Sequence, residues 1–288
     1  MLTQQTPIQP ILHTSHIILD IKRLDQIHPF VSGNKFFKLK YNIQEAVRLK
    51  KSSVITFGGA YSNHIVATAY AAKQNQLKSI AIIRGDELAD KPRNITLTQA
   101  QAFDMQFNFV DRTQYKQRHH PQYLAQLQQQ YPNSYIIPEG GTNSLAIQGC
   151  QDILTSTEKQ YYDFICVAVG TGGTIAGLIE STTPDTHILG FSALKGDFLK
   201  QNIQDITAKS HWTLLSKYHF GGYAKITDEL IGFINTFEQR YVIPLEPIYT
   251  GKMMYGIFDL IAQDYFPKNS KILVIHSGGL QGKASLMP

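Results

Sequence analysis

The chain has 288 residues, of which 43% are hydrophobic and 17% are charged. This composition is typical of a globular protein with apolar material for one large core or two smaller ones, and the length favours about two domains. The formal charge is +5, and no run of five or more basic residues occurs. These features argue against nucleic acid as a partner and are compatible with small anionic metabolites as ligands.

The two cysteines, Cys150 and Cys166, lack CxxC spacing, and Cys166 lies inside an apolar run. They are typical of free thiols in a reducing compartment. The first ten residues lack a basic-then-apolar signal pattern, and no apolar run approaches the roughly 18 residues of a membrane span. We therefore expect a cytoplasmic protein with no membrane partner.

Predicted strands alternate with predicted helices along the chain, and several strands are apolar on both faces. This alternation predicts an α/β fold of mostly parallel sheets covered by helices. A glycine-rich turn near 140–144 favours a change of domain there. In chain order, we predict strand 17–22, a tight turn that presents Lys35, helix 38–50 with Leu39, Ile43, Ala46 and Val47 on its apolar face, strand 53–57, helix 64–73, strand 79–84, helix 94–103, strand 105–110, helix 122–130, strand 135–138, helix 146–156, strand 164–169, helix 175–180, strand 187–191, helix 227–239, helix 253–264 and strand 271–276.

Four of the predicted strands end in glycine-rich turns. Ligands of open α/β sheets bind outside the carboxyl ends of strands, so several of these turns could face one crevice. The turns are Gly58-Gly59, Gly140-Gly141, Gly170 to Gly173, and Gly278-Gly279.

The third of these turns is the candidate anion site. Glycines let the backbone approach an anion, the following helix start supplies free N–H groups, and two threonine hydroxyls add donors. Ile175 stands where a dinucleotide-binding fingerprint has its third glycine, and the Gly-Lys-Ser/Thr of a P-loop is absent. A plain strand-to-helix turn is the alternative. The loop residues are Gly170, Thr171, Gly172, Gly173 and Thr174.

Lys35 stands between a Gly-Asn turn and two phenylalanines. A lysine that is partly desolvated among aromatic side chains has a lowered pKa and becomes nucleophilic toward an aldehyde. The alternative is an ordinary exposed lysine, which composition alone favours and which we expect for Lys38 and Lys40.

Ser62, Asn63 and His64 begin a predicted helix directly after a glycine pair. Ser62 or Asn63 is a natural N-cap, and the same helix start could instead bind a carboxylate. His64 has no matched Asp or Cys that would make it a catalytic base. The sequence shows no metal-ligand cluster and no nucleophile elbow.

Taken together, these segments resemble the fold-type II (tryptophan synthase β-like) pyridoxal-phosphate enzymes, in the branch of 1-aminocyclopropane-1-carboxylate (ACC) deaminase and D-cysteine desulfhydrase. The resemblance covers residues 17–282 in the same order. The matching motifs are SGNKFFKL (32–39), GGAYSNH (58–64), PEGGTN (138–143), GTGGTIAG (170–177), PIYTGK (247–252) and HSGG (276–279).

The resemblance implies a two-domain enzyme whose pyridoxal 5′-phosphate (PLP) lies between the domains. A large cofactor-binding domain would span 1–41 and 144–288, and a small α/β domain would span 42–143. The family also suggests a homodimer that acts on a small amino acid.

The resemblance further assigns the cofactor contacts. Lys35 is expected to carry PLP as a Schiff base. Asn63 would hydrogen-bond the phenolic oxygen of the cofactor, and Thr250 would face its pyridine nitrogen. The loop from Gly170 to Thr174 would hold the phosphate.

The substrate contacts come from the same source. Ser62 and its helix start would hold the substrate carboxylate, with Asn63 and His64 beside it, and Ser62 would also act near the reacting carbon. Tyr249 and Tyr223 would border the substrate, and Ser277 is a further substrate contact. The implied catalytic residues are Lys35, Ser62, Tyr249 and Tyr223.

Two departures distinguish members of the branch. ACC deaminases have a glutamate at the position of Thr250 and a leucine at that of Ser277, whereas hydroxyl residues at both resemble D-cysteine desulfhydrase. A glutamate keeps the pyridine nitrogen protonated and makes the ring a strong electron sink, which opening a cyclopropane requires. Expelling hydrosulfide needs a weaker sink. The resemblance therefore implies α,β-elimination of D-cysteine, or a similar β-substituted D-amino acid, to pyruvate, ammonia and hydrogen sulfide.

Three alternatives remain open. The chain could be an ACC deaminase, or it could eliminate or racemise another amino acid such as D-serine. It could also be a binding protein that has lost catalysis, since it is short for the branch and we expect trimmed loops around 195–212. The presence of Lys35, Asn63 and the phosphate loop argues against a pure binding module.

Overall fold

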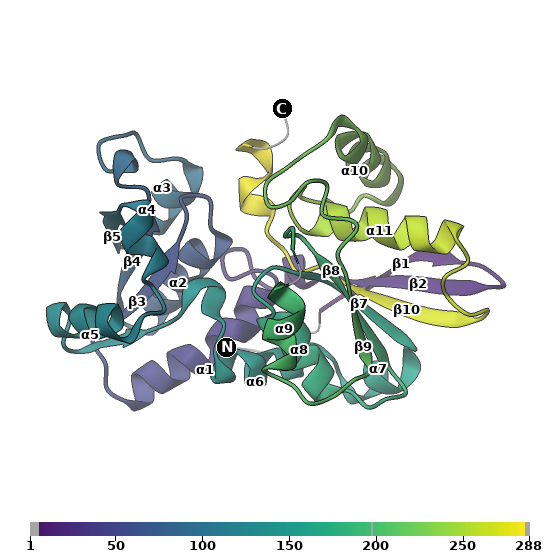
Figure 1. Ribbon diagram of the computed structural model, residues 1–288, viewed down its shortest axis with the longest axis horizontal. Coiled ribbons are helices and arrows are strands. Elements are labelled where there is room, and N and C mark those ends of the chain that lie inside the picture. Colours follow the sequence, from purple (N-terminus) through teal and green to yellow (C-terminus); the bar gives the residue numbers. More distant parts are fainter. Residues whose placement is uncertain (1–5, 197, 286–288) are drawn as a thin grey trace. The chain divides into compact units, whose positions relative to one another are not determined.

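The computed structural model describes residues 6–196 and 198–285, and the chain divides into two compact units. The first unit comprises Met1–Asn34 and Cys150–Pro288, and the second comprises Lys35–Gly149 (Figure 1). Each unit is an α/β structure built on its own sheet, as the sequence predicts. The predicted domains, 1–41 with 144–288 and 42–143, are parts of the chain that are expected to fold independently. Compact units do not test independent folding, so these bounds stay a prediction.

The first unit contains a six-stranded sheet in the order β1-β2-β10-β7-β8-β9. β1 pairs antiparallel with β2, and the other neighbours pair in parallel. The inner strands are buried on both faces, as expected for a parallel sheet between helices. The strands are β1 (Ile8–His13), β2 (Ile17–Lys22), β7 (Phe164–Val169), β8 (His187–Ser192), β9 (Trp212–Leu215) and β10 (Ser270–Ile275).

Helices cover both faces of this sheet. Figure 1 shows α10 and α11 on one side, where they form the main hydrophobic core with β2, β7, β8 and β10, and α7, α8 and α9 on the other. The helices are η1 (Leu24–Gln26), η4 (Gln151–Ile153), α7 (Ser156–Tyr161), α8 (Gly173–Ser181), α9 (Phe198–Gln204), α10 (Asp228–Tyr241), α11 (Thr250–Ala262) and η5 (Leu280–Ser285).

The second unit contains a four-stranded parallel sheet in the order β5-β4-β3-β6. One apolar cluster packs α2 and α3 on the sheet, and a second packs α4 and α5 on its other face. The elements are α1 (Asn34–Arg48), β3 (Ser53–Gly58), α2 (Asn63–Gln74), β4 (Lys78–Arg84), η2 (Asp86–Leu88), α3 (Ile95–Ala102), β5 (Met105–Val110), α4 (Arg112–Lys116), α5 (Pro121–Gln130), β6 (Ser134–Ile136), η3 (Glu139–Gly141) and α6 (Ser144–Cys150).

The strand order reverses once in each sheet, between β7 and β10 in the first unit and between β3 and β6 in the second. Such switch points are where open α/β sheets bind ligands at the carboxyl ends of their strands. All four glycine-rich turns follow these four strands: Gly170 follows β7, Gly278 follows β10, Gly58 ends β3 and Gly140 follows β6. The fold therefore places two of the turns at the switch point of each unit.

Several predicted elements are wrong in detail. Helix 38–50 starts earlier, at Asn34, so Lys35 lies in the first helical turn, and Val47 is 48% exposed and not part of the apolar face. The predicted helix 146–156 is instead α6, η4 and α7. The break occurs because Thr155 starts α7 with a capping box, in which its side chain accepts the N–H of Glu158.

The stretch 195–212, expected to be a trimmed loop, contains α9, while residue 197 lies outside the described residues. β1, α4 and β9 are not predicted from the sequence. Within the described ranges, no helix is both long enough and apolar enough to span a bilayer.

Candidate functional site

The turn before Lys35 is fixed against the end of β10. Gly33 has φ +66°, and a Cβ there would lie 1.9 Å from the carbonyl oxygen of Ser277. The N–H of Asn34 donates to the same carbonyl at 3.2 Å. The Asn34 amide also donates to Thr174 Oγ1 at 2.8 Å. Asn34, which precedes Lys35, is therefore anchored both to Thr174 and to Ser277, and all three residues belong to the first unit.

The loop from Gly170 to Thr174, which is predicted to hold a phosphate and is called the phosphate loop for that reason, has the geometry of an anion site. Gly172 is the N-cap of α8 with φ +83°, and no side chain caps this helix start. A helix whose first N–H groups have no side-chain acceptor favours an anion through those groups and its dipole. Thr174, in the first turn, is 5% exposed.

Tyr249 lies against the same loop. A Cβ on Gly170 would come within 3.0 Å of the Tyr249 ring, so the glycine permits this close approach. The ring of Tyr223 is tilted 63° to that of Tyr249, with centroids 6.2 Å apart. The structure thus brings together two tyrosines that the sequence could pair only through a loose match.

Thr250 starts α11 and is held by Glu246, which is 2% exposed. The Glu246 carboxylate accepts N–H bonds from Ile248, Tyr249 and Thr250 at 2.6–2.8 Å and the Thr250 hydroxyl at 3.1 Å. The Thr250 hydroxyl oxygen in turn accepts the N–H of Glu246 at 3.0 Å. Burial raises the pKa of Glu246, and these hydrogen bonds act against that rise. One hydroxyl lone pair of Thr250 is left to accept a further bond.

In the second unit, Lys35 lies in the first turn of α1 and Lys38 one turn later. Lys38 was expected to be exposed, but it is 2% exposed. Its Nζ donates to the carbonyl of Gly140 at 3.0 Å and to Thr142 Oγ1 at 2.9 Å. Lys38 therefore fixes the turn after β6, which explains why its ammonium group can be buried.

Ser62 is the N-cap of α2, yet its side chain makes no capping hydrogen bond. The Ser62 hydroxyl therefore accepts no hydrogen bond from the first N–H groups of α2. Asn63 Oδ1 is buried and has no hydrogen-bond partner among the described residues. A buried amide oxygen left in this way would be satisfied by a ligand group that donates a hydrogen bond, such as a hydroxyl.

His64 is 1% exposed and shares a 2.8 Å hydrogen bond with Thr56 Oγ1. Since Thr56 donates its own hydrogen to the carbonyl of Ile137, His64 must donate through Nε2. Burial, followed by the positive charges of Lys35 and Lys38, holds the pKa of His64 well below its usual range. The imidazole is therefore neutral at physiological pH, and its packing against Gly141 joins the turns after β3 and β6.

The predicted residues thus fall into two groups. Gly170–Thr174, Tyr223, Tyr249, Thr250 and Ser277 belong to the first unit, and Lys35, Ser62, Asn63 and His64 to the second. The peptide bond from Asn34 to Lys35 links the two groups. Sequence reasoning missed the supporting roles of Asn34, Lys38 and Glu246. The Glu-Pro-Ile-Tyr-Thr spacing, with an acid just before a helix start, was the available signal for Glu246.

The residues fit PLP as a ligand. An uncapped helix start behind a glycine turn suits a phosphate, and the orphan amide oxygen of Asn63 suits a ring substituent that donates a hydrogen bond, such as a phenolic hydroxyl. Thr250 offers a hydroxyl acceptor, and Lys35 offers the amine that an aldehyde requires. Across the described residues, no group of His, Cys, Asp and Glu side chains could hold a metal ion.

Comparisons with known proteins agree with this fit. Residues 2–278 match the family model "Pyridoxal-phosphate dependent enzyme". A Pyrococcus horikoshii protein provisionally named 1-aminocyclopropane-1-carboxylate deaminase is 31% identical over 96% of this chain and 90% of its own length. The mitochondrial bifunctional D-cysteine desulfhydrase/ACC deaminase of Arabidopsis thaliana is 31% identical over 91% of this chain and 72% of its own.

A crystal structure of an ACC deaminase homologue superposes with a TM-score of 0.82 at 27% identity, over 99% of this chain and 94% of that one. The fold-type II architecture expected from the sequence is confirmed. With its cofactor thereby identified as PLP, the chain belongs to the family of pyridoxal-phosphate dependent enzymes.

Proposed function

We propose that the chain is a lyase that converts D-cysteine, or a similar β-substituted D-amino acid, into pyruvate, ammonia and hydrogen sulfide. PLP, when bound, supplies the electron sink for loss of the Cα proton. The Cα–H and Cβ–S bonds break, hydrosulfide leaves with a proton, and the released 2-aminoacrylate reacts with water to give pyruvate and ammonia.

The observation that carries this proposal is the environment of Thr250. Its hydroxyl hydrogen is directed to the buried Glu246, so it can offer a ring nitrogen only a neutral lone pair. A neutral acceptor stabilises a protonated pyridine less than a carboxylate does, so the electron sink is moderate. A moderate electron sink is sufficient for the loss of hydrosulfide, whereas the opening of a cyclopropane requires a stronger one.

The proposed roles of the other residues follow from their positions. Lys35 would hold the cofactor through Nζ. Once the substrate amino group has displaced it, the released Nζ amine or the Ser62 hydroxyl would take the Cα proton. The uncapped α2 start at Ser62 binds the substrate carboxylate, with Asn63 on the phenolic oxygen of the cofactor. The loop from Gly170 to Thr174 holds the phosphate, and the Asn34–Thr174 bond supports Lys35 and this loop serving one cofactor.

The remaining substrate contacts are part of the same proposal. Tyr249 and Tyr223 border the substrate, and Ser277 adds a hydroxyl at the end of β10. His64 belongs to the substrate side in this scheme. Because it is buried and neutral, we assign its contribution to holding the turns after β3 and β6.

ACC deamination is the second candidate function, because relatives of this chain are named as ACC deaminases. A panel of D- and L-amino acids and ACC, assayed for sulfide, pyruvate and 2-oxobutanoate, separates the two. We expect sulfide and pyruvate from D-cysteine in equal amounts and little 2-oxobutanoate from ACC. Turnover of ACC at a rate equal to or above that of D-cysteine would overturn the proposal, and so would activity confined to L-amino acids.

The resemblance also supports a cytoplasmic homodimer. The mass of the PLP-loaded protein, measured by light scattering after gel filtration, tests the dimer directly.

A further inference from the structure

Lys252, two positions after Thr250 in α11, is buried, and no carboxylate of residues 6–196 or 198–285 is shown in hydrogen-bond contact with it. It is 2% exposed, and burial lowers its pKa to about 8. Its Nζ donates to the carbonyl of His219 at 2.9 Å and to that of Gly222 at 2.8 Å. A buried ammonium group bound to two carbonyls of one turn holds that turn to the helix.

The turn belongs to the 217–223 loop, which lies between β9 and α10. Its backbone is sterically demanding at Phe220, a non-glycine residue with positive φ, which is followed by Gly221 and Gly222, also at positive φ. Positive φ at non-glycine residues is unfavourable and persists only where surrounding contacts enforce it. The loop therefore needs anchors outside itself.

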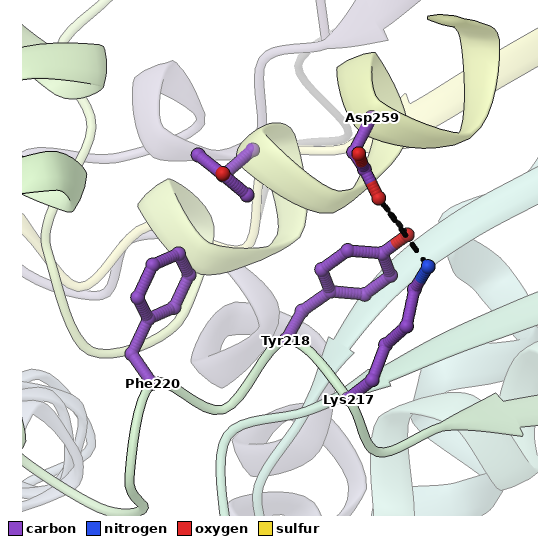
Figure 2. Close-up of a pocket in the computed structure, with 5 residues that line it drawn as sticks. Lys217, Tyr218, Phe220 and Asp259 are labelled. Carbon is purple, nitrogen blue, oxygen red and sulfur yellow. Dashed lines mark hydrogen bonds and ion pairs between the residues drawn. The ribbon is translucent and has the colours of Figure 1, made fainter. Parts of the chain in front are cut away.

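Further anchors come from the same face of α11. The Phe220 ring packs edge-on against Tyr255 with centroids 4.9 Å apart, and the Tyr218 hydroxyl donates to Asp259 at 2.7 Å. Figure 2 shows the Tyr218 hydroxyl and the Lys217 amine converging on Asp259, in a surface pocket that these residues line. Because 252, 255 and 259 are spaced by three and four residues, they share one helix face.

The loop ends at Tyr223, whose ring contacts Tyr249 next to the phosphate loop. We propose that Lys252 is a positioning residue, whose ammonium group holds the 217–223 loop on α11 and thereby sets Tyr223 beside Tyr249. Its effect on substrate selection rests on the proposed function, since that function makes Tyr223 a substrate contact. The holding of the loop does not depend on it.

Limited digestion with trypsin tests the loop directly, because Lys217 and Lys225 flank the anchored turn. In the PLP-loaded Lys252→Met protein, we expect cleavage after Lys217 and Lys225 to be faster by about tenfold or more, since hydrogen bonds to a charged group are each worth about 1.5–3 kcal/mol. Lys268→Met is the matched control: it removes an exposed lysine just beyond α11 and should digest like wild type. Equal digestion of the Lys252→Met and wild-type proteins would overturn the proposal.

Two further measurements keep the test decisive if Lys252→Met fails to fold. Lys252→Gln retains an amide donor and should give intermediate digestion. Amide hydrogen exchange of the wild-type protein needs no variant, and residues 219–224 should exchange more slowly than an unstructured peptide. Unprotected exchange there would show that the loop is not held.

A kinetic measurement then tests the link between Lys252 and Tyr223, with the substrate that the amino-acid panel identifies. Lys252→Met should lower kcat/KM, and this loss should vanish in the Tyr223→Ala background, because Lys252 then has no tyrosine to position. Fully additive losses would overturn the link to Tyr223. If the panel finds no substrate, the proposed function fails, while digestion and exchange still decide whether Lys252 holds the loop.

Discussion

At the scale of single residues, the choice of Lys35 over its neighbours has a structural basis. Lys38 is one helical turn away and is already committed to the Gly140 carbonyl and the Thr142 hydroxyl. Its burial and its two acceptors leave it unsuited to capture an aldehyde. Lys35, by contrast, follows a residue bound to the phosphate loop.

Lys35→Ala should abolish covalent attachment of PLP. After borohydride reduction, mass spectrometry of wild-type peptides should find the cofactor on Lys35, and the variant should show none, because Lys35 is the lysine that directly follows the anchored Asn34. Lys40→Ala, which removes an equal charge from the same helix, should retain full labelling. Labelling of Lys38 in either protein would contradict the assignment.

The sequence separates these lysines only in part. Motif resemblance selects Lys35, but spacing alone treats Lys38 as an ordinary helical lysine. Its burial depends on two acceptors about a hundred residues later in the chain. Glu246 is similar, since its role needs the turn from Pro247 to Tyr249 to bring three N–H groups onto one carboxylate. The role of Lys38 depends on acceptors distant in the chain, and that of Glu246 depends on the exact conformation of a local turn, so neither role follows from residue spacing alone.

At the scale of elements, Gly33 sets where α1 begins. Gly33→Ala should lower the free energy of unfolding by about 3 kcal/mol or more, because its Cβ would overlap the Ser277 carbonyl and its φ is positive. Urea denaturation followed by circular dichroism measures the change.

Gly232→Ala is the opposite case and serves as the control. This glycine lies inside α10 with nothing within 4 Å of the added Cβ, so the substitution should stabilise by about 0.5–1 kcal/mol. Similar effects from both substitutions would show that Gly33 is not a packing constraint.

The eight strands predicted from the sequence all occur, and the two that it misses, β1 and β9, are the edges of the six-stranded sheet. Inner strands are apolar on both faces and therefore easy to recognise. β1 instead carries Pro10 next to a register shift and is mostly exposed or half-buried, as edge strands usually are. Strand prediction fails here because the physical signal is weak.

At the scale of the whole molecule, the chain leaves and re-enters the first unit, and the second unit is a continuous segment. A fragment of residues 35–149 should therefore fold alone, since it contains its complete sheet and both of its apolar clusters. Cooperative unfolding in urea, followed by circular dichroism, is the measurement.

The shorter fragment 42–143, which follows the sequence-predicted bounds, should be less stable by several kcal/mol. It lacks the buried Phe37 and Leu39, each worth about 1.5–3 kcal/mol, and the close approach of Gly149 to the Phe37 carbonyl. Equal stability of the two fragments would favour the predicted bounds.

Helix α11 presents Thr250 at its first turn, while the face defined by Lys252, Tyr255 and Asp259 carries the 217–223 loop. Helix α11 thus supports two proposed site residues through separate contacts. One is Thr250, the proposed partner of the ring nitrogen, and the other is Tyr223, proposed to border the substrate. On the roles proposed above, substitutions in the loop would change substrate preference without altering the Glu246–Thr250 pair. The proposed roles therefore imply that what the enzyme accepts can change while the electron-withdrawing strength of its cofactor stays the same.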